Sequence, residues 1–419
     1  MKLRSIIIIF LILAALPSSP EAQAQEVDEL VAQAFAANPD LAAMATQVTA
    51  LQERSEGARM WADPVFSVEY SSVPYDTLAL DESPMSGVQF VLRQALPFPG
   101  KNARREATAV AETEVMQWRL AERKVQLAGL LRQTYWQLAL TRRLAALTDE
   151  HLKLVEQLRQ AVGASYQTGR AGQADLLRLD ILAEKLREDR RDFTRDEATL
   201  TAKINAALHR DPGTPIVTPA QIPPTSPQGE LAALIERADA DRPLLKMWRA
   251  AAQQKEEAAR LARAEPWPDV SVWAGYRYRE ELPMDPGDDF VSFGLAFPLP
   301  LDVAGQYRAK RRALTTEAGA ARQELEAARN DIRGALAADL AQWQRASDKA
   351  RLYRDRLVPL ARTTLESTLA AWQTGRADFT ALYQAQAQLI DFERVIAQAQ
   401  FTAMNMKIGV DALIGETGE

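Results

Sequence analysis

The chain has 419 residues, with 50 Lys and Arg against 56 Asp and Glu and a formal net charge of −6. This balance provides no overall basic field for nucleic acid, and the absence of cysteine excludes disulfides, thiolate nucleophiles and Cys-ligated zinc. Only His151 and His209 could supply imidazole, which disfavours a metal site or a Ser-His-Asp triad, so we expect no enzyme, no metal and no cofactor.

Residues 1–24 have the three parts of a secretory signal peptide. A basic start precedes an apolar run of 11 residues, Ile6 to Leu16, and the triplet Ala22-Gln23-Ala24. The run is shorter than the ~20 residues that a membrane helix needs, so a retained anchor is the less favoured alternative. We expect an exported chain, cleaved after Ala24, whose mature part has no membrane helix.

The rest of the sequence contains an internal duplication. Pro64–Val68 matches Pro268–Val272 at an offset of 204, and Tyr166–Arg170 matches Trp372–Arg376 at an offset of 206. Landmarks in one order at a nearly constant offset indicate two copies of one unit. The predicted organisation is a first repeat at 25–210, a proline-rich linker at 211–229, a second repeat at 230–415 and a tail at 416–419.

Each repeat is predicted to run as helix, hairpin, long helix, turn and returning helix. Apolar spacing predicts a first helix from about Val27 to Trp61, with a counterpart from about Glu230 to Ala264. Alternating β-branched and aromatic residues then predict four strands, with a loop rich in Asp and Pro inside each pair. The strands are expected at about 64–74 and 87–97 in the first repeat, and at about 268–279 and 289–299 in the second.

The long helix of the first repeat is predicted over about Asn102 to Val162, where no proline occurs. Its length would be about 90 Å, which favours a conduit or coiled coil over a compact core. Apolar residues recur every seven positions along two adjacent seams, one containing Leu131 and Leu138 and the other Leu140 and Leu147. Two seams predict a helix with neighbours on both sides, as in a ring of helices, whereas an ordinary bundle explains only one.

The four predicted strands have the ~9–11 residues that a tilted transmembrane strand requires. Open sheet edges are excluded from lipid because unpaired backbone groups cost several kcal/mol each, and single-chain barrels start at ~8 strands. Strands that span a bilayer must therefore come from several chains, and three chains would supply twelve. Two surface hairpins on a periplasmic helical protein remain the alternative. Four aromatic residues are either an interfacial belt or ordinary β-formers: Trp273, Tyr276, Tyr278 and Phe290.

The duplicated unit resembles the TolC family of outer-membrane efflux proteins. The likeness is most specific at Tyr166-x-x-Gly169, at Trp372-x-x-Gly375 and at the segment Leu96–Lys101, which is similar to the branch paired with metal and drug pumps of the RND class. The resemblance implies a mostly α fold with membrane β-hairpins. In it, a trimeric α-barrel tunnel joins a 12-stranded β-barrel with four strands per chain, located in the outer membrane and extending into the periplasm.

The same resemblance implies the outer-membrane channel of a tripartite efflux system, a passive exit duct. Its expected partners are two further copies of the chain, a periplasmic adaptor, an inner-membrane pump of the RND class and outer-membrane lipid. Two alternatives stay open: the exit duct of a type I protein secretion system, and a periplasmic coiled-coil adaptor or scaffold without a channel. The substrate, whether metal ion, drug or protein, is left open because its choice belongs to the pump.

Carried over by residue, the family's adaptor-contact tips fall at the turns that end the long helices. Its acidic gate pair would fall on Ala381 and Gln384, which are not acidic. The candidates for a pore constriction are therefore Asp175 and Asp378, although Asp also caps helices well, and capping is the role favoured for Asp378. The tip residues are Thr168, Gly169, Arg170, Thr374, Gly375 and Arg376.

Overall fold

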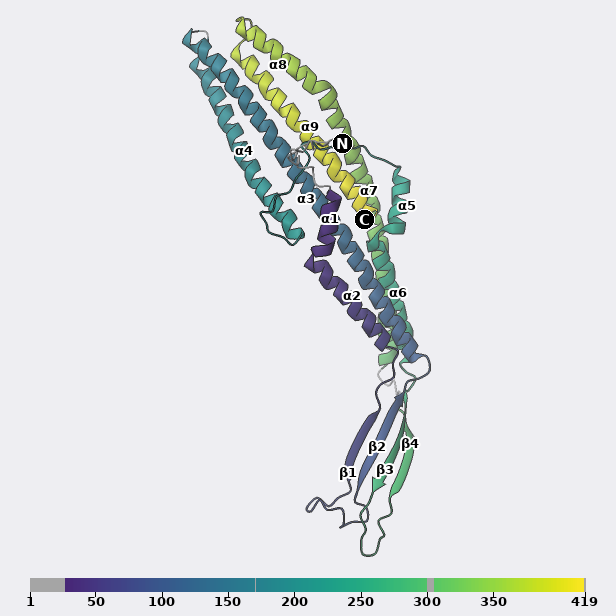
Figure 1. The fold of residues 1–419 in the computed structure, drawn as a ribbon. Coiled ribbons are helices and arrows are strands. Elements are labelled where there is room, and N and C mark those ends of the chain that lie inside the picture. Colours follow the sequence, from purple (N-terminus) through teal and green to yellow (C-terminus); the bar gives the residue numbers. More distant parts are fainter. Residues whose placement is uncertain (1–26, 170, 300–304, 418–419) are drawn as a thin grey trace, which may run out of the picture.

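The computed structural model describes residues 27–169, 171–299 and 305–417. Helices occupy one part of an elongated molecule, and four strands extend from one end of that part (Figure 1). The predicted signal peptide lies outside the described residues. Within them, the element order of the first half is repeated in the second half, which confirms a mostly helical fold built from a duplicated helix–hairpin–helix unit.

The first predicted helix of each repeat is in fact two helices. In the first repeat α1 (Val27–Ala37) and α2 (Pro39–Gly57) meet at Asn38, whose side chain accepts a hydrogen bond from the Asp40 N–H at 3.0 Å. In the second repeat α5 (Leu231–Asp241) and α6 (Pro243–Ala264) meet at Arg242. The prediction of one continuous helix was wrong because a residue before proline is disfavoured in the helical region, whereas proline itself suits the first helical position.

The long helices run between the strands and the far end of the molecule (Figure 1). In the first repeat α3 (Lys101–Gln167) is unbroken over 67 residues, about 100 Å, and α4 (Gln173–Ala207) returns beside it. The counterpart of α3 consists of α7 (Gln306–Leu352), a π-helical turn (Tyr353–Leu357) and α8 (Val358–Gln373), followed by α9 (Phe379–Leu413).

The π-helical turn coincides with Pro359, the second residue of α8. Proline has no N–H to give to the carbonyl four residues earlier, and the Val358 N–H instead bonds to the Tyr353 carbonyl, five residues back. This widening has no counterpart in the uninterrupted α3, so the two repeats differ in the regularity of their long helices.

The four strands form one antiparallel sheet in chain order: β1 (Val65–Ser71), β2 (Gly87–Leu96), β3 (Val270–Tyr278) and β4 (Phe290–Ala296). The pairing of β2 with β3 joins the two repeats, with Val88 opposite Tyr278 and Leu96 opposite Val270. Both β-hairpins therefore contribute to a single sheet.

Buried apolar residues form a series of clusters along the helices. The cluster nearest the far end draws on α3, α4, α8 and α9, with Leu158, Leu179 and Leu382 among its most buried members. The linker packs against this framework, because Ile216 and Ile222 are buried in two different clusters. None of the described helices is both long enough and apolar enough to cross a bilayer.

Candidate functional site

The two tip turns lie at the end of the helices farthest from the strands (Figure 1). Gly169 and Gly375 have φ of +72° and +73°, the left-handed conformation that ends a helix and favours glycine. Thr168 and Thr374 each donate a hydroxyl hydrogen bond to a carbonyl three residues earlier, at 3.0 Å. The two turns thus have equivalent geometry and leave Thr374, Gly375 and Arg376 exposed. Arg170 lies outside the described residues.

The two candidate constriction residues both cap returning helices. Asp175 accepts a hydrogen bond from the Gly172 N–H at 3.1 Å, and Asp378 accepts one from the Ala381 N–H at 2.8 Å. Both carboxylates also line one cavity of about 450 Å³ between the two tips. The structure therefore brings Asp175 and Asp378 to one space, while each makes the capping contact that its position at a helix start favours.

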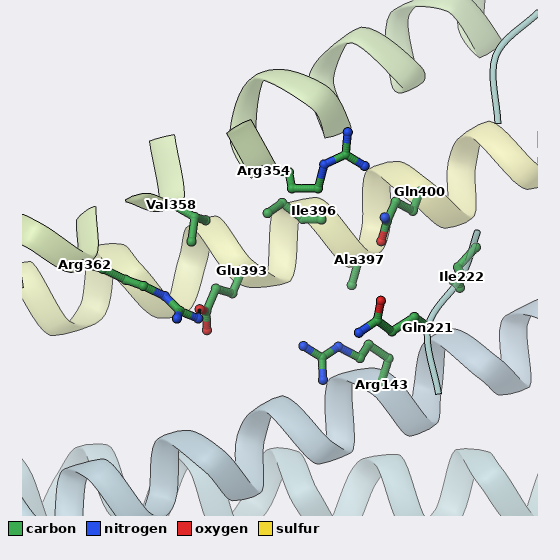
Figure 2. A pocket seen from close by; sticks show the side chains of 10 residues that line it. All are labelled: Arg143, Gln221, Ile222, Arg354, Val358, Arg362, Glu393, Ile396, Ala397 and Gln400. Carbon is green, nitrogen blue, oxygen red and sulfur yellow. Dashed lines mark hydrogen bonds and ion pairs between the residues drawn. The ribbon is translucent and has the colours of Figure 1, made fainter. Parts of the chain in front are cut away.

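A polar site that was not predicted joins α3, α8 and α9, and Figure 2 shows Glu393 and Arg362 beside the cavity next to it. His151 on α3 places Nε2 3.1 Å from a carboxylate oxygen of Glu393 on α9, and Arg362 on α8 lies 2.6 Å from the other oxygen. Arg143 and Arg354 line the adjacent cavity of about 190 Å³. The site joins the two repeats, and only the folded chain brings its members together, so local spacing around His151 gave no signal for it.

Glu393 is the acidic centre of this site. Burial raises the pKa of Glu393, but His151 and Arg362 outweigh that effect and bring the pKa below its ordinary value. The Glu393 carboxylate, held by the His151 imidazole and the Arg362 guanidinium, is a structural contact that ties α3, α8 and α9 together. Among the described residues no three His, Cys, Asp or Glu side chains approach one another as metal ligands would.

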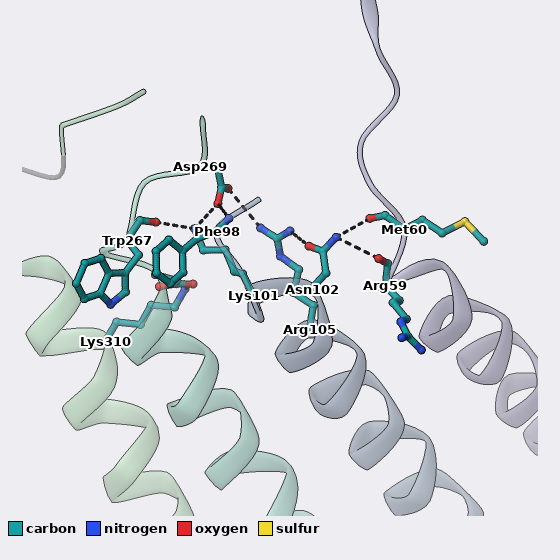
Figure 3. A network of polar contacts seen from close by, with 10 residues as sticks. Arg59, Met60, Phe98, Lys101, Asn102, Arg105, Trp267, Asp269 and Lys310 are labelled. Atoms are coloured by element: carbon teal, nitrogen blue, oxygen red, sulfur yellow. Dashed lines mark hydrogen bonds and ion pairs between the residues drawn. The ribbon is translucent and has the colours of Figure 1, made fainter. Parts of the chain in front are cut away.

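A second polar network connects the sheet to the helices (Figure 3). The buried Lys101 ammonium, at the start of α3, donates to Asp269 at 2.9 Å and to the Trp267 carbonyl at 3.0 Å. Asp269 also accepts the Phe98 N–H at 2.9 Å. The Phe98 and Trp267 rings stack with centroids 5.1 Å apart. Phe98 and Lys101 lie where α3 begins, and Trp267 and Asp269 directly precede β3. The network therefore fixes the orientation of the sheet relative to the helices.

Acid should weaken this network. Partial burial raises the pKa of Asp269, but the Phe98 N–H, Lys101 and Arg105 together hold it below its ordinary value. A carboxylate with a lowered pKa stabilises the folded chain above the unfolded pKa of about 3.9, and this contribution is lost as the pH falls through the lowered value. We expect Asp269→Asn to be less stable at pH 7 and to lose less stability than the original chain between about pH 5 and pH 2.

Thermal unfolding of the two chains across this pH range checks the expectation. Asp63→Asn is the control, because Asp63 lies at the same level, is exposed and has no ion-pair partner in the described part of the chain. Parallel pH profiles for Asp269→Asn and the original chain would contradict the assignment.

The sheet has one apolar face, which is open to the surroundings of the chain. Alternation along the strands and the pairing register place apolar residues in rows that cross all four strands. One row is Phe66, Leu92, Ala274 and Phe293, and the next is Val68, Phe90, Tyr276 and Val291. Phe293 and Val291 are 86% and 74% exposed. An exposed apolar surface of this extent marks an interaction with a membrane or a partner.

The opposite face of the sheet is mostly polar or small. Glu69 lies opposite Gln89, which lies opposite Arg277, and Arg93 lies opposite Trp273. Trp273 packs flat over Gly294, where a Cβ atom would come within 2.8 Å of the indole ring. Serines at 67, 71, 271 and 292 complete this face. An antiparallel sheet with one apolar and one polar face suits a boundary between an apolar phase and water.

The chain was compared with protein families, curated proteins and solved structures. The family described as outer membrane efflux protein matches residues 234–416. A sequence search among curated proteins gives no match. The match to the solved structure of the outer-membrane channel OprN covers 93% of this chain and 89% of the OprN chain, with a TM-score of 0.77 and 18% sequence identity.

Two further solved structures show the same similarity. VceC from Vibrio cholerae matches 94% of this chain and 97% of its own, with a TM-score of 0.77 and 15% identity. The MtrE outer-membrane channel of Neisseria gonorrhoeae matches 94% and 89%, with a TM-score of 0.73 and 15% identity. At these identities the similarity is one of fold, and it extends over nearly the whole chain.

Proposed function

We propose that the chain, whose residues 234–416 match the outer membrane efflux protein family, is the outer-membrane exit duct of a tripartite efflux system. The observation that supports this most directly is the sheet, whose apolar face suits lipid and whose polar face suits a water-filled passage. Such a duct is passive: it supplies a route, and the pump supplies the driving force. Selectivity then depends on the lining and gating of the passage.

The duct requires several copies of the chain. In the described sheet β1 and β4 are the outer strands, and their free edges would each expose unpaired N–H and C=O groups to lipid at several kcal/mol per group. Edge-to-edge joining of sheets from neighbouring copies removes this cost. A homotrimer supplies twelve strands, above the ~8 at which barrels begin, and its long helices continue the barrel as a tunnel through the periplasm.

Conductance tests the duct directly. The purified mature chain, added to a planar bilayer, should give discrete ion-conducting steps, and outer-membrane extracts should contain trimers that dissociate on heating. Release of a soluble monomer by osmotic shock, together with a silent bilayer, would refute the proposal.

The tip turns support docking of a periplasmic adaptor that is itself bound to an inner-membrane pump. Thr374, Gly375 and Arg376 are exposed at the end of the molecule farthest from the membrane-facing sheet. Because the chain has no cysteine, a single Cys introduced there would be the only thiol.

We expect Thr374→Cys to form a disulfide with a cysteine-bearing adaptor tip in intact cells. Thr316→Cys, on α7 close to the strands, should form none, because that position lies at the opposite end of the helical part. Non-reducing gels of the cross-linked material give the measurement. Equal cross-linking at both positions would count against docking at the tip.

The alternatives are separated by the same features. A periplasmic coiled-coil scaffold would leave the apolar face of the four-stranded sheet exposed to water. The sheet therefore favours a duct over a scaffold. An exit duct for secreted proteins would share this geometry, and identification of the adaptor captured by Thr374→Cys distinguishes it from a duct for small molecules.

A further inference from the structure

A groove that the proposed function does not use lies between α7 and α9, which run side by side (Figure 1). Its volume is about 480 Å³, within the ~300–1,000 Å³ of small-molecule sites. Ala346 and Ala399 are its buried residues and form an apolar floor. The rest of the lining consists of Ala341, Gln342, Arg345, Lys349, Gln398 and Thr402. Because its apolar residues are all alanine, the floor is open to a ring or an alkyl segment.

The lining of the groove contains two cationic side chains and no acidic one. In the part of the chain that the structure describes, Arg345 has no ion-pair or hydrogen-bond partner, and the Lys349 ammonium faces the Tyr353 ring, 5.9 Å from its centroid. Asp348, the nearest acidic residue along α7, pairs with Arg351 instead. Neither charge in the groove is therefore neutralised by a salt bridge within the described residues.

The two charges act on the same space. Arg345 and Lys349 are four residues apart on α7, a spacing that places side chains on one side of a helix. Like charges at this spacing destabilise a helix, and an anion bound between them would relieve the repulsion. A guanidinium binds the oxygens of an anion through parallel N–H donors, and an ammonium adds a second point charge. The groove is therefore complementary to a negative group joined to an apolar body.

The groove opens on the side of α7 away from the linker. Trp343 and Ser347 donate hydrogen bonds to Thr225 of the linker, at 3.0 and 2.7 Å. Arg345 is two residues from each of them, so it lies on the opposite side of the helix. A ring of twelve helices spaced ~9 Å apart encloses a space roughly 25 Å across, which three linkers would obstruct. In the proposed duct the linker therefore lies outside, and the groove faces the passage.

A helix of a second copy fits this groove less well than a small molecule does. Packing of a helix requires an apolar stripe over several turns. The apolar part of the groove spans only about one and a half turns of α7, from Ala341 to Ala346, and a single residue of α9. Its short apolar floor beside two charges suits a compact ligand.

We infer that the groove between α7 and α9 binds amphiphilic organic anions, molecules with an apolar body and a carboxylate or sulfonate group, as they move along the passage. The inference rests on the proposed function for the position of the groove on that passage. It names a class of transported molecule, whereas the duct alone requires only a water-filled route.

The test is equilibrium dialysis of naphthalenesulfonate against the full mature chain, assembled in a non-ionic detergent, with the detergent alone as the blank. Naphthalenemethanol is the neutral compound with the same rings. R345Q/K349Q removes both charges and should bind the sulfonate at least about tenfold more weakly, and A341W fills the groove without changing its charge. The matched control is R187Q/R191Q, which removes two exposed arginines, also four residues apart, on α4, outside the groove.

The original chain should bind naphthalenesulfonate more tightly than naphthalenemethanol. R345Q/K349Q and A341W should lose this binding, and R187Q/R191Q should keep it. Equal binding by R345Q/K349Q and R187Q/R191Q would overturn the inference, and so would equal binding of the two compounds by the original chain. If R345Q/K349Q does not assemble, A341W decides. If A341W does not assemble, a second copy covers the groove, and the inference is overturned.

Conductance of the same preparation is scored separately. A conducting protein that does not prefer the sulfonate refutes the groove alone. A silent protein that binds the sulfonate refutes the duct, and with it the position of the groove on a passage.

Discussion

Phe293→Lys should remove the assembled channel from the outer membrane. Phe293 belongs to the apolar face of the sheet and is 86% exposed in the single chain, so in a barrel it would face lipid. A lysine on the lipid face near the middle of a bilayer costs about 2–4 kcal/mol, and an oligomer would incur that cost in every subunit. Heat-dissociable trimers on unboiled gels of outer-membrane extracts provide the measurement.

Ser292→Lys is the matched control for this prediction. Ser292 directly precedes Phe293 on β4, and the alternation of a strand places it on the polar face. The same new charge would there meet water, so we expect trimers to form in near-normal amounts. Equal loss with both substitutions would mean that the sheet does not separate lipid from water.

Arg242→Met should produce the largest loss of stability among changes in the helical part. Arg242, between α5 and α6, lies 2.7 Å from Glu122 on α3, and the two side chains are only 10% and 7% exposed. Burial lowers the pKa of Arg242 against the opposing effect of Glu122. Without Arg242 the Glu122 carboxylate would remain buried and uncompensated, at a cost of about 3–5 kcal/mol.

A double substitution separates loss of the ion pair from loss of packing. Arg242→Met combined with Glu122→Leu replaces the pair by apolar groups, so most of the stability should return. Arg187→Met, which removes an exposed partner of Glu184 on α4, should change the free energy of unfolding by less than about 1 kcal/mol. Thermal unfolding of the assembled protein measures all three, and a double variant as unstable as Arg242→Met would contradict the ion-pair explanation.

Much of the fold could be predicted from the sequence because the strongest sequence signals are repeated patterns. The offset between Pro64 and Pro268 revealed the duplication, and the alternating β-branched and aromatic residues around Phe90 and Tyr276 indicated strands. Period-two and seven-residue patterns depend only on neighbours along the chain. The broken first helix was also accessible in principle, because Asn38-Pro39 and Arg242-Pro243 are helix-boundary signals.

The ion-pair sites could not be predicted in the same way. Glu393 is 242 residues from His151, and Arg242 is 120 residues from Glu122. Each pair exists only once the two repeats pack together, and no local pattern distinguishes these residues from the many solvated charges on the helices. For the tips, the resemblance identified the turns and helix capping was already the favoured role of Asp378, whereas the hydrogen bond from the Gly172 N–H to Asp175 required coordinates.

The pairing of β2 with β3 has a consequence for biogenesis. The first hairpin ends at Leu96, and its partner strand ends at Tyr278, about 180 residues later. At a synthesis rate of roughly 5–20 residues per second, that interval is on the order of ten to forty seconds. During this interval the edge of β2 that later pairs with β3 is unpaired, and an unpaired strand edge promotes aggregation. We therefore expect the chain to need a holdase chaperone most at this stage.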